Sequence, residues 1–140
     1  MIMTSDGKQR PAHIHHVPNS FLAKSTAQST GMRRLEAISG VTTGSEKIWM
    51  GESHIEPSTR SDDHHHGESE TGIYVLSGNP VFIFLKDDEE TRIETKPGDY
   101  VYVPPFVAHR EENPSEVEEA VVILARTTQE AIVVNLTSLR

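Results

Sequence analysis

Short β-type segments, each bounded by turn residues, follow one another through most of this chain. Turn signals such as Gly78-Asn79-Pro80 and Pro97-Gly98-Asp99 separate them. Closely spaced short strands, in a sequence whose apolar residues show no long helical period, are typical of a β-sandwich or β-barrel. We therefore predict an all-β fold with strands near residues 35–39, 47–55, 73–76, 81–85, 91–94, 100–103, 108–112, 119–125 and 131–136, although 116–126 also fits a short helix.

The length of 140 residues is that of one ordinary domain. Residues 1–30 are polar and irregular, rich in Ser, Thr, Gln and Lys, and we expect them to form a partly irregular N-terminal arm. Residues 31–140 contain the β-type pattern and are predicted to form the barrel domain. No internal repeat is visible.

Composition excludes several functional classes. Without cysteine there are no disulfides, thiolate ligands or cysteine nucleophiles, so any metal must be held by nitrogen and oxygen donors. A net charge of −8 with no basic cluster argues against a nucleic-acid partner. No segment approaches the ~20 apolar residues that cross a bilayer, and the first residues lack the apolar core of a signal peptide, so we expect a cytoplasmic protein without a membrane partner. The acidic pairs, Glu111-Glu112 among them, are interpreted as solvated turns.

The histidines of residues 64–113 indicate a metal pocket. His64 and His66 are two apart, so on an extended chain they point to the same side. Glu70 follows four residues later, and His109 lies on a later predicted strand. Imidazole and carboxylate are ligands for zinc, iron, nickel, copper or manganese. The alternative is an exposed polar loop, which the neighbouring acidic residues would suit.

Two motifs support the metal interpretation through a family resemblance. His64-x-His66-x3-Glu70, followed by a strand that ends at Gly78, resembles the first cupin motif. Gly98-x5-Pro104-x4-His109-x3-Asn113 resembles the second. The resemblance implies a jelly-roll barrel, or double-stranded β-helix, in a single domain. It also implies that His64, His66, Glu70 and His109 bind one divalent transition metal (Fe, Mn, Ni, Zn or Cu) inside the barrel.

Three positions depart from the family pattern. Ser58 stands where cupins usually have a glycine, six residues before the first histidine. Pro104-Pro105-Phe106 replaces Pro-x-Gly, and because Phe is strained at positive φ, we expect a different turn geometry there. The stretch between Glu70 and Gly78 is one residue longer than in the family.

That extra residue bears on the carboxylate ligand. If the strand runs unbroken back from Gly78, Thr71 faces the lumen and Glu70 faces away. For Glu70 to reach the metal, one residue must be absorbed, and we expect a β-bulge at Gly72. The competing hypothesis is a three-histidine site with Thr71 in the lumen.

The predicted pocket is apolar and has few polar anchors. Three arginines near strand ends, Arg34, Arg60 and Arg126, are placed where they could meet a substrate carboxylate, although surface salt bridges are the simpler interpretation. Placement by pattern puts five aromatic residues at the pocket, namely Trp49, Tyr74, Phe84, Tyr102 and Phe106.

These features predict a metal-binding protein that acts on a small molecule. A metalloenzyme is favoured, with a dioxygenase first and an isomerase or lyase next; the alternative is a non-catalytic cupin that binds or senses a small ligand. Residues 81–85 are apolar on both faces, and because cupins commonly pair, we expect a homodimer.

Overall fold

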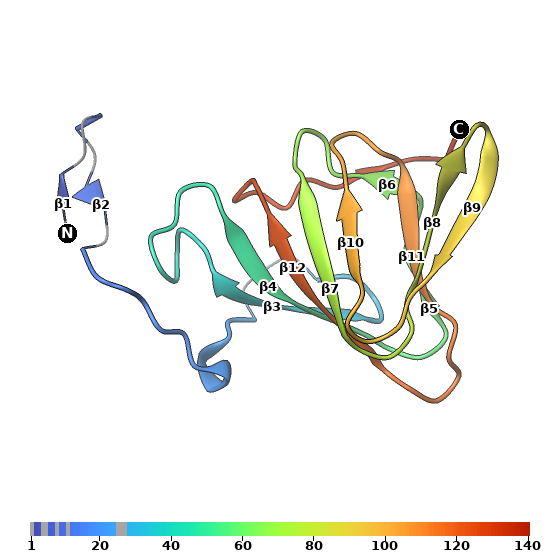
Figure 1. Cartoon of the computed structure of the whole chain (residues 1–140), viewed down its shortest axis with the longest axis horizontal. Coiled ribbons are helices and arrows are strands. Elements are labelled where there is room, and N and C mark those ends of the chain that lie inside the picture. The colour runs from blue at the N-terminus through green and yellow to red at the C-terminus, as the bar shows by residue number, and fades with distance from the viewer. Residues whose placement is uncertain (1, 4–5, 8, 11, 25–27) are drawn as a thin grey trace.

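The computed structural model describes residues 2–3, 6–7, 9–10, 12–24 and 28–140. Two antiparallel sheets face each other in a jelly-roll barrel, as the sequence predicts (Figure 1). The five-stranded sheet has the order β10-β7-β12-β4-β3. Its strands are β3 (Met32–Ile38), β4 (Trp49–Ile55), β7 (Thr71–Ser77), β10 (Tyr100–Val103) and β12 (Ala120–Arg126).

The six-stranded sheet carries the histidine motifs. Its order is β13-β6-β11-β8-β9, and β5 also pairs with β11. The segment 116–126, for which a helix was the alternative, contains strand β12. None of the described residues belongs to a helix with the length and apolar character needed to cross a bilayer. The strands of this sheet are β5 (Thr59–Arg60), β6 (His64–His65), β8 (Val81–Lys86), β9 (Glu89–Glu94), β11 (His109–Asn113) and β13 (Val134–Asn135).

The N-terminal part is attached to the barrel through β3. Ala23 and Glu36 exchange backbone hydrogen bonds of 2.9 and 2.7 Å. Before this bridge lie a short 3₁₀ helix, η1 (Asn19–Phe21), and a two-stranded ribbon of β1 (Ile2–Met3) and β2 (Gln9–Arg10). Figure 1 shows this ribbon apart from the two sheets.

Inward-facing apolar side chains form the core of the barrel. The main cluster combines residues from both sheets: Ile73, Val75, Phe82, Val103 and Val122, all at most 7% exposed. A smaller cluster of Met32, Ile55 and Ala120 continues it along β3, β4 and β12. Each Val, Ile, Phe or Met side chain among them contributes about 1.5–3 kcal/mol when fully buried.

The expected bulge at Gly72 is absent, which corrects the sequence interpretation. Residues 71–74 of β7 pair in regular register with β10, and Gly72 lies opposite Ala125 of β12. The irregularity lies farther along, because Val122 pairs with Val75 and Val121 pairs with Ser77, which leaves Leu76 unpaired in this ladder. Thr71, Ile73 and Val75 are therefore buried, whereas Glu70 and Gly72 are exposed.

Two positions that depart from the family pattern adopt left-handed backbone. Ser58 has φ 55° and Phe106 has φ 62°. Phe106 therefore accepts the conformation that we expected it to avoid. Its N–H donates a 2.8 Å hydrogen bond to the Gly67 carbonyl, which ties the turn to the first motif. The glycine-type turn persists with a bulky residue at a local cost of about 1–3 kcal/mol.

Candidate metal centre

Strand pairing brings the three predicted histidines together. His64 of β6 lies directly opposite His109 of β11, and His66 follows β6 by one residue. The ring centroid of His64 is 4.5 Å from that of His109 and 4.8 Å from that of His66. His66 and His109 are 5.1 Å apart by the same measure. The chain turns at Gly67, which has φ 56°, and this leaves His66 beside the C-terminal segment.

Each ring is oriented by a backbone carbonyl. The Nδ1–H groups donate to Asp62 O at 2.6 Å for His64, Ile132 O at 2.8 Å for His66 and Val107 O at 3.0 Å for His109. A carbonyl can only accept, so the proton sits on Nδ1 and the lone pair on Nε2. Three Nε2 atoms with free lone pairs are what a metal ion requires of imidazole ligands.

The carboxylate in the cluster is Glu111. One ligand atom each from His64, His66, His109 and Glu111 can be chosen so that all lie within 4.8 Å of one another. Glu111 is two residues beyond His109 on β11, so strand alternation places both on the inner face. This His-x-Glu spacing was visible in the sequence, but the pair Glu111-Glu112 was interpreted as a solvated turn. The structure corrects that interpretation.

Glu70, the carboxylate that the family resemblance implies, is not brought to the histidines. It is exposed, and its Oε1 accepts a 2.5 Å hydrogen bond from the Tyr102 hydroxyl. The cause is the regular pairing of residues 71–74 with β10, which turns Thr71 inward and leaves Glu70 facing outward. The competing hypothesis placed Thr71 correctly, although the site also has a carboxylate.

Burial and mutual contact shift the charges of the cluster. Burial lowers the pKa of His64, and it lowers the pKa of His66 to about 4. Burial also acts to lower the pKa of His109, but the Glu111 carboxylate outweighs it and raises that pKa. Burial opposes ionisation of Glu111, yet the three imidazoles, chiefly His109, bring its pKa down to about 2. The carboxylate is therefore ionised and available as a ligand.

One buried ring nitrogen, Nε2 of His109, indicates that the cluster is suited to binding a metal ion. Nε2 of His109 is buried and has no hydrogen-bond partner within the described part of the chain. The Glu111 Oε1 atom is 3.8 Å away, too far for a hydrogen bond. Buried polar atoms normally have partners, and a metal ion between these residues would supply one.

The cluster opens into a cavity of about 580 Å³ between the two sheets. Polar groups form much of its wall, contrary to the apolar pocket expected. All three arginines singled out from the sequence line it, as does Thr71. The remaining lining residues are Gln28, Ser29, Thr30, Met32, Ser53, Ser61, Asp62, His64, His66, Ser69, Glu111, Leu124, Ala131, Ile132, Val133 and Asn135.

The five aromatic residues predicted at the pocket do not line this cavity. Tyr102 and Phe106 are 59% and 67% exposed, and Tyr74 packs against Tyr100. Phe84 is partly buried next to His109 in the ladder, but it is not part of the cavity wall. Trp49 is buried; its Nε1–H donates to Glu36, and its ring lies against the guanidinium group of Arg126, which does line the cavity. The outward parity of Tyr74 and Tyr102 explains the difference for these two residues.

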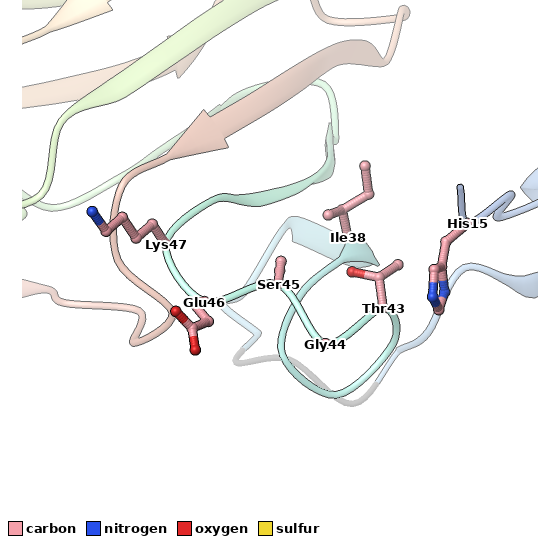
Figure 2. A pocket seen from close by; sticks show the side chains of 7 residues that line it. All are labelled: His15, Ile38, Thr43, Gly44, Ser45, Glu46 and Lys47. Atoms are coloured by element: carbon pink, nitrogen blue, oxygen red, sulfur yellow. The ribbon is translucent and has the colours of Figure 1, made fainter. Parts of the chain in front are cut away.

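A second hollow lies on the outside, away from the histidine cluster. The loop after β3, residues 43–47, forms it together with Ile38 and with His15 of the N-terminal part (Figure 2). In Figure 2 these side chains surround an open depression and do not converge on one point. It offers no ligand set comparable with that of the cluster.

Comparisons with known proteins decide the family. The family model described as "Cupin domain" matches residues 51–125, more than half of the chain. The chain belongs to the cupin family. A search of curated protein sequences found no match.

Solved cupins share the fold at low sequence identity. The polyketide cyclase RemF from Streptomyces resistomycificus matches with a TM-score of 0.75 and 17% identity, over 90% of this chain and 87% of that one. The S161A mutant of Bacillus subtilis oxalate decarboxylase OxdC matches with a TM-score of 0.66 and 23% identity, over 79% of this chain. This chain covers only 29% of the decarboxylase. At these identities the likeness concerns the fold alone.

Proposed function

We propose that this cupin is a metal-dependent enzyme that acts on a small molecule in its barrel cavity. His64, His66, His109 and Glu111 would hold one divalent transition metal ion, with Fe, Mn, Ni, Zn and Cu as the candidates. The observation that carries the proposal is the set of Nδ1–H bonds to backbone carbonyls, which leaves all three Nε2 atoms free as ligands. The buried, unpartnered Nε2 of His109 supports it independently.

The roles of the protein groups follow from their contacts. The carbonyls of Asp62, Ile132 and Val107 fix the ring orientations, and the ionised Glu111 supplies negative charge to the ligand set. When bound, the ion would supply Lewis-acid activation of a substrate oxygen or, if it is iron, electrons for oxygen chemistry.

Dioxygenase chemistry is our first candidate, because imidazole and carboxylate ligands would hold an iron ion, which could pass electrons to dioxygen. Lyase or isomerase chemistry is the second, and the charged cavity lining favours it. The structural neighbours include a cyclase and a decarboxylase, and one decarboxylase structure is described by its Mn(II) centres, at 23% identity and a TM-score of 0.66. These neighbours show that the fold can serve an enzyme, and the ligand cluster is what favours an enzyme here over the alternative, a cupin that only binds or senses a ligand.

Elemental analysis of the purified protein tests the metal site. We expect close to one transition metal ion per chain, and strong loss in His66→Ala and in His109→Ala. His65→Ala is the matched control: this residue lies between the ligands, but its Nδ1 accepts a hydrogen bond from the Gly67 N–H and its ring packs near Phe106. Equal metal content in His65→Ala and His66→Ala would reject the proposed ligands.

Oxygen consumption by the iron-loaded protein, with a panel of enolic and aromatic acids, separates the candidate reactions. Consumption that depends on His66 supports a dioxygenase. Substrate turnover without consumption supports a lyase or isomerase. Tight binding without turnover supports the binding or sensing alternative.

The homodimer remains a prediction. Its sequence argument, that residues 81–85 need a partner to cover them, loses force because Val81 and Ile83 are 2% and 1% exposed in the single chain. The outer face of β7 and β10 keeps exposed apolar side chains, namely Leu76, Tyr100 and Tyr102. A molar mass in solution equal to that of one chain, measured by light scattering, would contradict this prediction.

A further inference from the structure

Two guanidinium groups of the five-stranded sheet line the cavity, and the histidine–glutamate cluster lies on the six-stranded side of the same cavity. Arg34 is on β3 and Arg126 is the last residue of β12. His64 and Glu111, from β6 and β11, line the same cavity. The cavity therefore has the ligand cluster on one wall and positive charge on the other.

Arg126 is held in position by contacts that leave part of its guanidinium available. Its Nε–H donates to Thr128 O at 3.0 Å, and Nη2 donates to Gln129 O at 2.9 Å. The Cζ atom lies 3.9 Å from the centroid of the Trp49 ring, which supports the guanidinium plane from one side. Within the described residues Nη1 has no partner, so donor capacity remains for a ligand.

Arg34 has weaker ties. Its Nη1 donates to Ser29 Oγ at 2.9 Å, and its Nη2 lies 3.9 Å from the Met32 sulfur. Neighbouring Arg33 points the other way and is exposed. The described chain provides no ion-pair partner for Arg34 or Arg126. Glu36, the carboxylate on the same face of β3, instead accepts the Trp49 indole N–H.

No carboxylate of the described residues forms an ion pair with either guanidinium group, and two partly buried guanidinium groups in this state are costly unless a ligand offsets their charge. Burial and the charge of Arg34 both lower the pKa of Arg126, whereas Glu36 acts in the opposite direction. Guanidinium groups bind carboxylates with paired, charge-assisted hydrogen bonds. The whole chain has a net charge of −8, so this basic wall is a local feature of the cavity.

We propose that Arg34 and Arg126 form a subsite for the carboxylate of a small organic acid, which they hold while the rest of the molecule faces His64, His66, His109 and Glu111. The first part of this inference, carboxylate binding by the two arginines, does not depend on the proposed function. The second part names the substrate class of the metal site and therefore rests on that function. Arg60, also in the cavity lining but exposed, lies at the rim and is not needed for the subsite.

Binding of simple acids and their amides tests the subsite without any assay of activity. The probes are formate, malonate and benzoate, each paired with formamide, malonamide or benzamide. Dissociation constants are measured by two-dimensional NMR titration of the full chain, metal-free and zinc-loaded, with the arginine Nε–Hε signals as local reporters. We expect at least one acid to bind about tenfold or more tightly than its amide, because the amide cannot accept charge-assisted bonds.

Three substitutions locate the effect. Arg34→Gln and Arg126→Gln should each weaken binding of that acid about tenfold and leave binding of its amide unchanged. Arg33→Gln removes the same charge from the adjacent outward position and should change neither. Since Arg126→Gln also removes the bonds to Thr128 and Gln129, the Arg34→Gln variant keeps the test valid if the first variant is poorly folded.

The outcomes separate this inference from the proposed function. If no acid binds better than its amide, or if Arg33→Gln weakens binding as much as Arg34→Gln, the subsite is rejected even when the protein contains its metal. If the protein binds no metal but acids still bind through Arg34 and Arg126, the metal-dependent function is rejected and the anion subsite stands.

Discussion

Tyr102 donates a 2.5 Å hydrogen bond to Glu70 on the outer face of the five-stranded sheet, and this contact holds the Glu70 carboxylate away from the three histidines. The same contact raises the pKa of Tyr102, because ionisation would remove the proton that the phenol donates to the Glu70 carboxylate. The motif spacing of the family implies that Glu70 is the carboxylate ligand, whereas the carboxylate that lies beside the three histidines is Glu111.

The two carboxylates make a matched pair of substitutions. Glu111→Gln removes a charge from the cluster and should weaken Zn²⁺ binding by about 100-fold or more, because outer-shell changes alone cost about 10–100-fold. Glu70→Gln removes a charge of the same size from outside the barrel and should leave Zn²⁺ affinity within about twofold. Competition with a chromogenic chelator measures both constants.

The reverse result, weak binding in Glu70→Gln and normal binding in Glu111→Gln, would restore the ligand set implied by the family motif. It would also require residues 70–72 to rearrange when the metal binds, which a crystal structure with zinc would show.

Burial of His66 predicts a pH-dependent stability of the metal-free protein. Its pKa is lowered to about 4 in the fold, from 6.5 in the unfolded chain. Between these values the unfolded chain binds more protons, so the free energy of unfolding should fall as the pH decreases from 6.5 to 4. The expected contribution of His66 is about 2–3 kcal/mol.

Urea unfolding at pH 7 and pH 4.5, with chelator present, measures this loss. The His66→Gln variant cannot be protonated at this position and should lose less stability over the same interval. The raised pKa of His109 acts in the opposite direction, since its contribution is present below pH 6.5 and is lost as the pH rises through the raised value. A variant that loses as much stability as the parent would show that His66 is not buried in its neutral form.

Strand alternation was sufficient to predict much of this architecture. His64 and His66 share a side because they are two residues apart, and His109 joins them because antiparallel pairing places β11 beside β6. The carboxylate could not be assigned in the same way. Its identity depended on where β7 accommodates its extra residue. The sequence suggested a bulge at Gly72, whereas in the structure Leu76 is the residue that is left unpaired with β12. The pocket composition depended on which inward-facing residues pack in the apolar core and which line the cavity, and alternation alone does not specify that.

The turn at Ser58 predicts a stabilising substitution. Ser58 has φ 55°, a conformation that costs a non-glycine residue about 1–2 kcal/mol, and cupins usually have glycine at the corresponding position. Ser58→Gly should raise the free energy of unfolding by up to about 1 kcal/mol, after the larger unfolded-state entropy of glycine is subtracted. Ser58→Ala keeps the Cβ atom and should give no gain. Urea unfolding of both variants distinguishes relief of strain from loss of the hydroxyl.

Asn113, the last residue of the second motif, is predicted to act in stability and not in chemistry. Its side chain is 2% exposed and lies at the end of β11. Its Nδ2 lies within hydrogen-bonding distance of the carbonyls of Ile55, Glu56 and Glu118, at 3.0, 3.2 and 2.8 Å, and its Oδ1 accepts from the Ser115 N–H at 3.2 Å. Asn113→Ala leaves these buried groups without a partner and should cost about 2–4 kcal/mol.

Asn79→Ala is the control for that substitution. Asn79 is exposed and donates a single bond, to Thr95 O at 3.1 Å, so its removal should cost about 1 kcal/mol or less. Both variants should bind zinc as the parent does at 20 °C, because neither residue contacts the histidine cluster. A large loss of zinc affinity in folded Asn113→Ala would mean that the junction between β4 and β11 also positions His109, and would give this asparagine a role in the site.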